Sequence, residues 1–379
     1  MKQHKKQFQK LLRAAMRKRK RLLSQYEKER PLYGFSETVD RVCGSALLAC
    51  MANIRTLNAS QPEQRSDEWF AMRRKRLTAS EYYKVLGTPV ACETFAFDKA
   101  TAILYPETTQ RQHRPPSFNE ARGWGTIFED VCVMIYTSYL RKGAVVEEFG
   151  LLPHQKHIFL GASPDGICNE KSVEDEHTGR MLECKAPYSR ELKKGCIKTA
   201  YLAQMQGQLE VTGLNECDYL ECQFERMTKE QAHEYVCSQQ APTPSPQTNI
   251  GGDKLPIAVG YIAFLPGAPQ SSFQYGKLNT IDDASVAASL AALECNDTYE
   301  RQIAATVVYW RLRDYQLLTV YRNKEWFDSE LFPKLTKTWE RVDELVANPD
   351  VYETVSTERK NKRKMKKPTP HKAVYAFRN

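Results

Sequence analysis

Apolar and polar residues follow two different periods along this chain, and the two periods predict both helices and strands. A period of three to four residues predicts helices over residues 36–58, 124–140, 199–213 and 326–346. Alternation of period two predicts strands over residues 144–152, 157–163, 181–186 and 217–225, and a hairpin-like pair over 307–322. Since helices and strands are interspersed, the pattern predicts an α/β or α+β class around a central mixed sheet flanked by helices.

Other segments carry patterns of a different kind. Residues 1–30 predict a basic helix, and residues 66–87 predict two short helical pieces. Residues 88–121 are loop-rich in composition. Residues 239–254 are rich in Pro, Ser and Gly and predict a flexible loop.

The composition narrows the class of protein. Of 379 residues, 41% are hydrophobic, and five Trp occur among them, which is typical of a globular chain. No apolar run approaches the roughly 18 residues of a membrane span, and the basic N-terminus lacks the apolar segment of a signal peptide, so we expect neither membrane insertion nor secretion. Eleven Cys without C-x-x-C spacing and seven scattered His indicate neither a zinc site nor a disulfide framework. The expected compartment is therefore reducing, either nucleus or cytosol.

The formal net charge of +9 is concentrated at the two ends of the chain. Residues 1–30 contain 12 Lys or Arg against 2 acidic residues, and residues 358–372 contain 8 against 1. Because these ends together carry +17, the remainder carries −8. Such basic runs serve nuclear targeting or phosphate contact, or are solvated tails. Because the part of the chain between these basic ends is acidic, it needs local Lys and Arg residues, or bound metal ions, to bind a polyanion.

The stretch MLECKA, residues 181–186, combines strand alternation with two charges. Alternation places the Glu183 carboxylate and the Lys185 ammonium on one face of the strand, roughly 6.6 Å apart along the chain. Charges on a half-buried strand are costly unless they are paired or bind something. The triplet alone also fits a solvated salt bridge on an edge strand, so its neighbours must decide between the two interpretations.

The upstream turn SPDG supplies one such neighbour, Asp165. If the strands on either side pair as a hairpin, the Asp165 carboxylate lies beside Glu183. Two carboxylates and a lysine at strand ends suit a hard divalent cation such as Mg²⁺, which lowers the pKa of bound water and shields phosphoryl charge. Lys185 can then orient or deprotonate that water. On its own, Asp165 would be a turn aspartate.

The series Asp165…Glu183-x-Lys185 resembles the signature of the PD-(D/E)xK nucleases. Its surroundings are similar to the phage lambda exonuclease branch, which includes alkaline nucleases of large DNA viruses such as baculoviruses. The supporting motifs occur in the expected order: EWFAMRRKRLTAS, WGTIFE, SPDG, LECKAP, YLAQMQ and YLECQF. The resemblance implies a restriction-endonuclease-like core with a central mixed sheet flanked by helices.

The resemblance also implies a domain organisation. Residues 65–224 would form the nuclease core, and residues 310–347 its closing strands and helix. The remaining parts would be a basic N-terminal helical extension (1–64), an insertion with the 239–254 loop (225–309) and a basic C-terminal tail (348–379).

Metal ligands follow from the same resemblance. Asp165, Glu183 and the Cys184 carbonyl would hold the ion, and Glu129 in WGTIFE would contribute to a second one. The implied cofactor is Mg²⁺ in a two-metal site, with Mn²⁺ as a substitute. Glu129 also fits the exposed side of a buried helix.

Further roles are implied for polar residues around these ligands. Lys185 would activate or position the attacking water. Gln206, and with less support Gln204, would support Lys185 and the metal-bound water. Arg73 and Ser80 would bind the 5′-phosphate of a DNA end through a guanidinium fork and a hydroxyl. Arg73 alone would also fit plain backbone contact, and Ser80 a helix N-cap.

The sequence therefore predicts a Mg²⁺-dependent deoxyribonuclease that trims linear double-stranded DNA from the 5′ end and exposes a 3′ strand for annealing or recombination. Its expected partners are double-stranded DNA ends and a single-strand-annealing or ssDNA-binding protein in a viral setting. The sequence is compatible with both a monomer and a homo-oligomer. One alternative is a structure-specific endonuclease, against which Arg73 and Ser80 argue. The other is a non-catalytic DNA-binding recombination accessory, against which the intact acidic residues and Lys185 argue.

Overall fold

The computed structural model describes residues 44–62, 66–109, 115–169, 177–240, 258–267, 272–295 and 305–365. The predicted basic helix over 1–30 and the predicted loop from residue 241 onward lie outside these residues. The chain forms two compact units. Unit 1 comprises Met1–Tyr83 and Arg111–Leu331, and unit 2 comprises Lys84–Gln110 and Phe332–Asn379.

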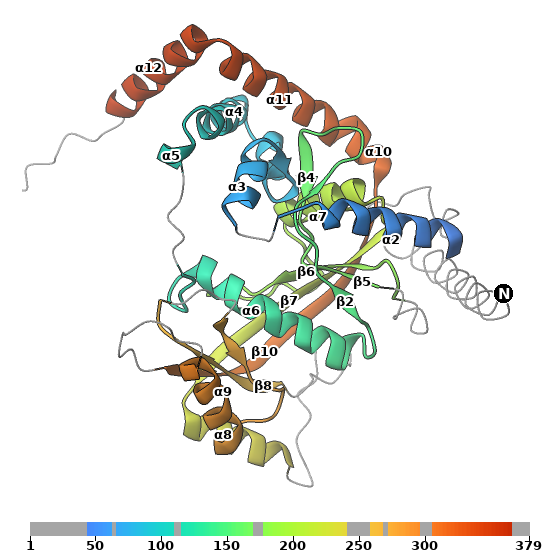
Figure 1. Ribbon diagram of the computed structural model, residues 1–379, viewed down its shortest axis with the longest axis vertical. Helices are drawn as coiled ribbons and strands as arrows, with labels where there is room; N and C mark the ends of the chain where they lie inside the picture. The colour runs from blue at the N-terminus through green and yellow to red at the C-terminus, as the bar shows by residue number, and fades with distance from the viewer. Residues whose placement is uncertain are drawn as a thin grey trace, which may run out of the picture. The chain divides into compact units, whose positions relative to one another are not determined.

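Unit 1 is built around a seven-stranded mixed sheet with the strand order β2-β5-β6-β7-β10-β8-β9 (Figure 1). Only β6 and β7 run parallel within it. Its strands are β2 (Val146–Glu147), β5 (Gly166–Cys168), β6 (Met181–Lys185), β7 (Glu216–Met227), β8 (Val259–Phe264), β9 (Gln274–Tyr275) and β10 (Thr306–Tyr321). A second, three-stranded sheet has the order β1-β4-β3, formed by β1 (Leu77–Thr78), β4 (Leu160–Ala162) and β3 (Leu152–Pro153).

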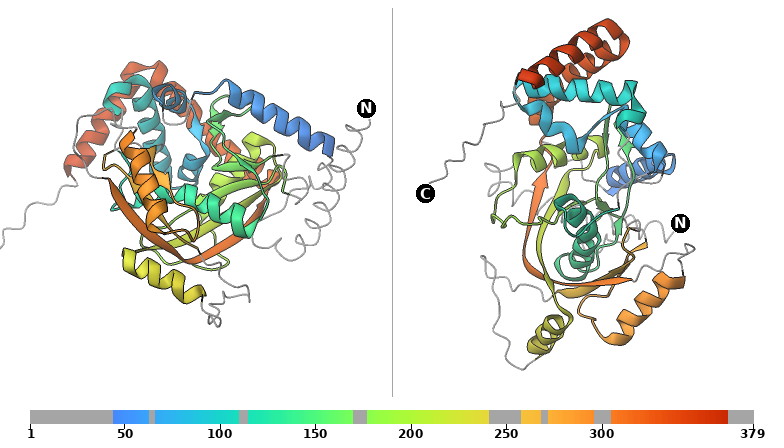
Figure 2. Two further views of the ribbon diagram at one scale, coloured as in Figure 1. Left: turned by 60° about the horizontal axis from the view of Figure 1, so that its bottom comes forward. Right: turned by 90° about the vertical axis from the view of Figure 1, so that its left-hand side faces the viewer.

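Helices cover both faces of the large sheet, as the sequence predicted. Helix α6 (Ala121–Ile135) buries Phe128 against one face, together with Ile262 of β8. The next residue of β8 on the opposite face, Ala263, packs instead with α8 (Lys229–Gln240) and α9 (Asp283–Cys295). Figure 2 shows the sheet curling around α6, with α8 on its outer side. The α/β class with a mixed sheet and flanking helices is therefore confirmed.

Helix α7 (Thr199–Thr212) is the crossover between the parallel strands β6 and β7. It ends at Gly213, whose φ of +70° suits the left-handed cap of a helix. Within α7, a Cβ on Gly207 would lie 2.4 Å from the ring of Tyr82. The absence of a side chain at Gly207 therefore lets α7 pack directly on the segment that follows β1.

The remaining elements of unit 1 are short or helical. They are α2 (Gly44–Ala59), α3 (Asp67–Arg74), the start of the 3₁₀ segment η2 (Ala79–Leu86), the π segments η3 (Tyr136–Leu140) and η6 (Phe327–Leu331), and α10 (Lys324–Trp326). Ser66 begins α3 by accepting the Trp69 backbone N–H. The strands predicted over 144–152 and 157–163 are present only as the two-residue and three-residue pieces β2, β3 and β4.

Unit 2 is helical, and here the expectation of a loop-rich segment over 88–121 is wrong. Residues 89–109 form α4 (Pro89–Leu104) and α5 (Pro106–Thr109), which accompany α11 (Phe332–Ala347) and α12 (Pro349–Met365). The physical reason lies at the start of α4: Thr88 accepts the backbone N–H of Ala91, and Pro89 occupies the first turn. Apolar residues of α4 then share a core with α11 and α12.

The predicted hairpin over 307–322 is also wrong, because β10 is one strand of 16 residues. It pairs with β7 from Tyr309 to Tyr321 and with β8 from Thr306 to Arg311. The polar run in its middle contains a register shift between Leu312 and Asp314 rather than a turn. A bulge of this kind bends a strand without ending it.

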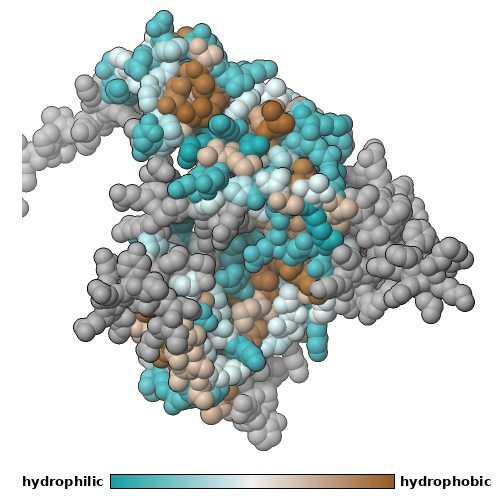
Figure 3. Space-filling view, in the orientation of Figure 1, coloured by the Kyte–Doolittle hydropathy of each residue, from teal (hydrophilic) through white to brown (hydrophobic). Residues whose placement is uncertain are grey.

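The face of the molecule seen in Figure 3 is mainly polar, and its apolar side chains gather in small groups. Across the described ranges, none of the helices combines the length and apolar character needed to cross a membrane.

Candidate active site

Two carboxylates meet where β5 and β6 pair. Gly166 is opposite Leu182 in antiparallel register, so Asp165, one residue earlier, comes opposite Glu183. Asp165 Oδ2 accepts the backbone N–H of Cys184 with a distance of 2.7 Å. The strand predicted over 157–163 does not pair with β6, because its β4 belongs to the three-stranded sheet. The short strand β5 after the SPDG turn pairs with β6 instead, and this pairing places Asp165 beside Glu183, as expected.

The two faces of β6 have different surroundings. Leu182, Cys184 and the following Ala186 belong to the apolar cluster that contains α6. Glu183 is fully buried on the opposite face. Lys185 Nζ donates to Glu183 Oε1 and, over 3.0 Å, to the Cys184 carbonyl. The alternation seen in the sequence thus places the charged pair on one face and the apolar residues on the other.

Helix α7 supplies two side-chain amides to the Glu183 carboxylate. Gln204 Nε2 donates to Oε1 over 2.6 Å, and Gln208 Nε2 donates to Oε2 over 2.7 Å. Gln208 Nε2 also lies 3.3 Å from the Ser163 carbonyl. Glu183 therefore accepts from two neutral donors in addition to Lys185.

Gln206 is placed elsewhere. Its Nε2 donates to the Tyr321 carbonyl over 2.7 Å, and its Oε1 accepts the Asn323 N–H over 2.6 Å. Residues two apart on a helix point about 200° apart, so Gln204 and Gln206 cannot both face one strand. The structure brings Gln204 to Glu183, whereas the resemblance favoured Gln206. Gln208 was missed, although its spacing of four from Gln204 puts the two on one face.

The acidic groups crowd one another electrostatically. Burial, and then the charges of Glu183 and Glu129, raise the pKa of Asp165 well above its ordinary value. Burial alone would lower the pKa of Lys185, but Glu183, Asp165 and Glu129 outweigh burial and raise it. Glu129 of α6 therefore lies within electrostatic reach of both residues. Three carboxylates against one ammonium make a site that favours additional positive charge.

The donor atoms present fit a hard divalent cation. Asp165, Glu183 and the Cys184 carbonyl offer oxygen only, which is the ligand type that Mg²⁺ takes. In the described part of the chain, no three His, Cys, Asp or Glu side chains form a ready ligand group. The Glu183 oxygens are instead engaged by Lys185 and by the amides of α7.

Arg73 and Ser80 lie together on a separate part of unit 1. Arg73 Nη2 donates to Ser80 Oγ over 2.9 Å, and its guanidinium lies 5.1 Å from the centre of the Trp69 ring. Burial, followed by the charge of Arg122, lowers the pKa of Arg73, while Glu81 opposes the change. A guanidinium next to an exposed serine hydroxyl suits a phosphate group.

Strand β4 connects this pair to the acidic site. β1, which joins Arg73 to Ser80 along the chain, pairs in parallel with β4 through Leu77 and Leu160. β4 in turn ends at Ala162, three residues before Asp165. The two sets of polar residues are thus attached to the same short strand.

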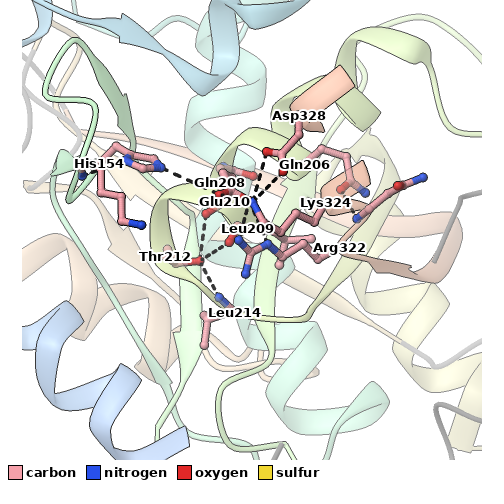
Figure 4. A network of polar contacts seen from close by, with 12 residues as sticks. His154, Gln206, Gln208, Leu209, Glu210, Thr212, Leu214, Arg322, Lys324 and Asp328 are labelled. Atoms are coloured by element: carbon pink, nitrogen blue, oxygen red, sulfur yellow. Dashed lines mark hydrogen bonds and ion pairs between the residues drawn. The ribbon is translucent and has the colours of Figure 1, made fainter. Parts of the chain in front are cut away.

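A polar network at the end of α7 fixes this helix from a second side (Figure 4). Arg322 Nε donates to Glu210 Oε2 over 3.0 Å, Lys324 Nζ lies 3.6 Å from Oε1, and His154 Nε2 lies 3.9 Å from Oε1. Burial alone would raise the pKa of Glu210, but His154 and Arg322 outweigh it and lower the pKa to about 2. The network ties α7 to the segments beside β10 and β3.

A buried ionic cluster holds the other end of β6. Asp218 on β7 accepts from Arg180 and Tyr136 over 3.0 Å each, from Arg141 over 2.9 Å and from Thr319 over 2.7 Å. Burial opposes ionisation, but the two arginines outweigh it and keep the pKa of Asp218 well below its ordinary value. Arg180 immediately precedes β6, so the cluster secures that strand to β7.

The chain is similar to proteins of two large DNA viruses and to a bacterial enzyme of known structure. An uncharacterized protein of Acanthamoeba polyphaga mimivirus is 27% identical over 301 residues, which are 74% of this chain and 53% of that protein. A protein of African swine fever virus is 25% identical over 174 residues, 40% of this chain and 47% of that protein. The chain therefore spans about half the length of the curated relatives it matches. The crystal structure of an alkaline exonuclease from Laribacter hongkongensis aligns with a TM-score of 0.42 at 17% identity, covering 78% of this chain and 99% of that one.

Residues 68–215 match the YqaJ-like viral recombinase domain. This range contains every residue that the sequence motifs singled out, from Arg73 and Ser80 to Lys185 and the glutamines of α7. The expected resemblance to viral recombinase exonucleases is thereby confirmed, and it covers residues 68–215 of this chain.

Proposed function

We propose that this chain is a metal-dependent deoxyribonuclease that digests linear double-stranded DNA from the 5′ end and leaves a 3′ strand for annealing or recombination. The observation that carries the proposal is the meeting of Asp165, Glu183 and Lys185 on the β5–β6 hairpin, with two glutamine amides on Glu183. The match to a viral recombinase domain supports the recombination setting.

Asp165, Glu183 and the Cys184 carbonyl would hold Mg²⁺ or Mn²⁺, and Glu129 would contribute to a second ion. Bound there, a divalent cation supplies a lowered pKa for its water and charge for the phosphoryl oxygens. The residues of the chain do the positioning. Gln204 and Gln208 fix the carboxylate of Glu183 without neutralising it.

Lys185 is the residue we assign to the attacking water. Its Nζ lies between the Glu183 carboxylate and the Cys184 carbonyl. A charged Nζ orients a water molecule by hydrogen bonding and stabilises negative charge that develops on the phosphate.

Arg73 and Ser80 are assigned to the terminal 5′-phosphate. Their contact leaves the guanidinium fork and the hydroxyl next to each other, and ionised phosphate accepts hydrogen bonds from both. An enzyme that requires a terminal phosphate starts at ends and ignores closed circles. The proposal extends to DNA ends as substrate, a single-strand-annealing protein as partner and the nucleus or cytosol of the host as the place of action.

The test uses 5′-phosphorylated linear duplex and covalently closed circular duplex, each with Mg²⁺, with Mn²⁺ and with EDTA. We expect loss of linear DNA only, abolished by EDTA and by Lys185→Ala. Cutting of closed circles would replace the proposal with a structure-specific endonuclease. DNA binding without cleavage under any metal would make the chain a recombination accessory.

A further inference from the structure

We infer that Tyr188 is a stacking platform for a nucleobase of the DNA strand that lies across the acidic site. This inference rests on the proposed function, because it takes DNA as the ligand. It assigns a contact to the base, whereas the residues described above address phosphate and metal.

Tyr188 lies shortly after β6, the strand that carries Glu183 and Lys185. It lies three residues beyond Lys185, a path of at most about 10 Å even for an extended chain. The segment runs against α6, because the Ala186 carbonyl is 4.0 Å from the place where a Cβ on Gly125 would be. Figure 1 shows α6 alongside β6. A base next to the phosphate held at Lys185 is therefore within reach of Tyr188.

The ring of Tyr188 is held in place and yet exposed. It packs on Trp124 in an edge-to-face arrangement, with 5.5 Å between ring centres and 74° between the ring planes. Trp124 is itself only 3% exposed and stands 4.4 Å from the ring of Phe128. Tyr188 nonetheless exposes 41% of its surface. A ring that is fixed before binding loses little entropy when a base stacks on it.

The loop that carries Tyr188 is basic, which suits a polyanion better than an apolar protein partner. Residues 187–198 contain Arg190, Lys193, Lys194 and Lys198 against one acidic residue, Glu191, and Lys193 and Lys198 are exposed. Arg226 lies 5.9 Å from the centre of the Trp124 ring that supports Tyr188. Aromatic rings with lysines alongside are the usual surface for single-stranded nucleic acid, since every base offers a π face. The contact should therefore be independent of base identity.

The experiment uses the full chain with Lys185→Ala, so that bound DNA stays intact. The probe is a 5′-phosphorylated duplex with 2-aminopurine at one of the first three nucleotides of the 5′ strand. Relative to Lys185→Ala alone, we expect added Tyr188→Ala to brighten bound 2-aminopurine at one of these positions. We also expect it to weaken binding about tenfold, or about 1.4 kcal/mol. Tyr188→Phe should retain both signals, and Tyr188→Leu, which preserves packing on Trp124, should lose them.

Tyr139→Ala is the matched control, because Tyr139 is 39% exposed and lies beyond the other end of α6. Equal fluorescence and affinity for the Tyr188→Ala and parent proteins would overturn the inference. If the chain with Lys185 intact digested linear DNA in that case, the proposed function would stand. Retention of both signals by Tyr188→Leu, as expected for Tyr188→Phe, would also overturn the inference, because leucine has no ring to stack on a base. Failure of every variant and of the parent to bind DNA would refute both proposals.

Discussion

Gln208 on α7 donates its side-chain amide to Glu183 on β6, with 2.7 Å between Nε2 and Oε2, and neither side chain is exposed. A neutral donor orients a carboxylate and leaves its charge available. A second lysine or arginine at this position would compensate that charge and compete with a cation for it. A carboxylate that binds a metal ion depends for its orientation on the hydrogen-bond donors around it.

Replacing Gln204 with Ala removes one of these donors from Glu183. We expect the digestion rate of linear duplex to fall about 10- to 100-fold, because outer partners of metal ligands contribute on that order. The thermal midpoint should change little, because Gln204 is only half-buried. Initial rates and differential scanning calorimetry on the same preparation provide the two readouts.

Gln206→Ala is the control on the same helix. It loses two buried hydrogen bonds, to Tyr321 and Asn323, so we expect a loss of stability of about 1–3 kcal/mol. Well below its thermal midpoint its rate should match the parent. A large loss of rate in Gln206→Ala, with Gln204→Ala unaffected, would restore the assignment favoured by the sequence resemblance.

Arg73→Ala should abolish the preference for phosphorylated ends. The guanidinium beside Ser80 is the charged partner that we assign to the terminal phosphate, so we expect the rate ratio between 5′-phosphate and 5′-hydroxyl duplex to fall at least tenfold. Arg74→Ala, the neighbouring residue, removes the same charge without that contact. A ratio that falls equally in both variants would indicate general DNA attraction and would count against a phosphate site at Arg73.

Asp218→Asn should be among the most destabilising single changes in unit 1. Asp218 is the common acceptor for Arg180 and Arg141, and its loss leaves the fully buried Arg180 with Glu216 as its remaining carboxylate partner. We expect a loss of about 3–5 kcal/mol in urea unfolding. Glu225→Gln, which weakens the exposed pair with Arg311, should cost no more than about 1 kcal/mol. Similar midpoints for the two variants would contradict the role of the buried cluster.

The Glu210 network of Figure 4 predicts an acid-sensitive part of the stability. The pKa of Glu210 is about 2 in the folded chain, against an ordinary value of 4.5, so the folded state binds this proton less readily than the unfolded state. The resulting stabilisation is complete above about pH 4.5 and is lost as the pH falls toward 2. We expect it to be roughly 1–3 kcal/mol, because the site is partly hydrated.

Unfolding free energies of the parent and of Glu210→Gln, measured from pH 6 to pH 2, check this prediction. Their difference should be largest at pH 6 and should shrink as the pH falls through that window. Asp218 titrates in both proteins and cancels in the difference. A difference that stays constant with pH would show that Glu210 contributes through packing alone.

Period-two alternation was sufficient to separate the two faces of β6, and the SPDG turn was sufficient to suggest that Asp165 lies beside Glu183. The choice among the glutamines was beyond the same reasoning. Helix α7 is buried on several sides, so its apolar residues, such as Met205 and Leu209, do not mark one face as the side that meets β6. The spacing of four residues between Gln204 and Gln208 does indicate that these two glutamines share a face of the helix. It identifies the face toward β6 once one of the two is known to contact Glu183.

The two incorrect secondary-structure predictions have a common physical cause. Pro89 and the polar run inside β10 both resemble breaks in a regular element. In the folded chain, Pro89 stands in the first turn of α4, where a missing N–H costs nothing, and the polar run of β10 stays paired with β7 on both sides of the bulge. A proline or a polar run in the sequence suggests a break, but contacts with distant parts of the chain determine whether the helix or strand ends there.

Each side chain that the structure places in contact with the Glu183 carboxylate comes from the short span 185–208, whereas β8 and β9 extend the sheet beyond β10. The residues that contact Glu183 and the strands that form this edge of the sheet are therefore encoded in separate segments of the chain. Lineages can lengthen, shorten or rebuild the edge formed by β8 and β9, which lie between β7 and β10 in the chain, without changing a residue that contacts Glu183. Divergence among relatives should accordingly be greatest at that edge, where new surfaces for partners can arise at little risk to the acidic site.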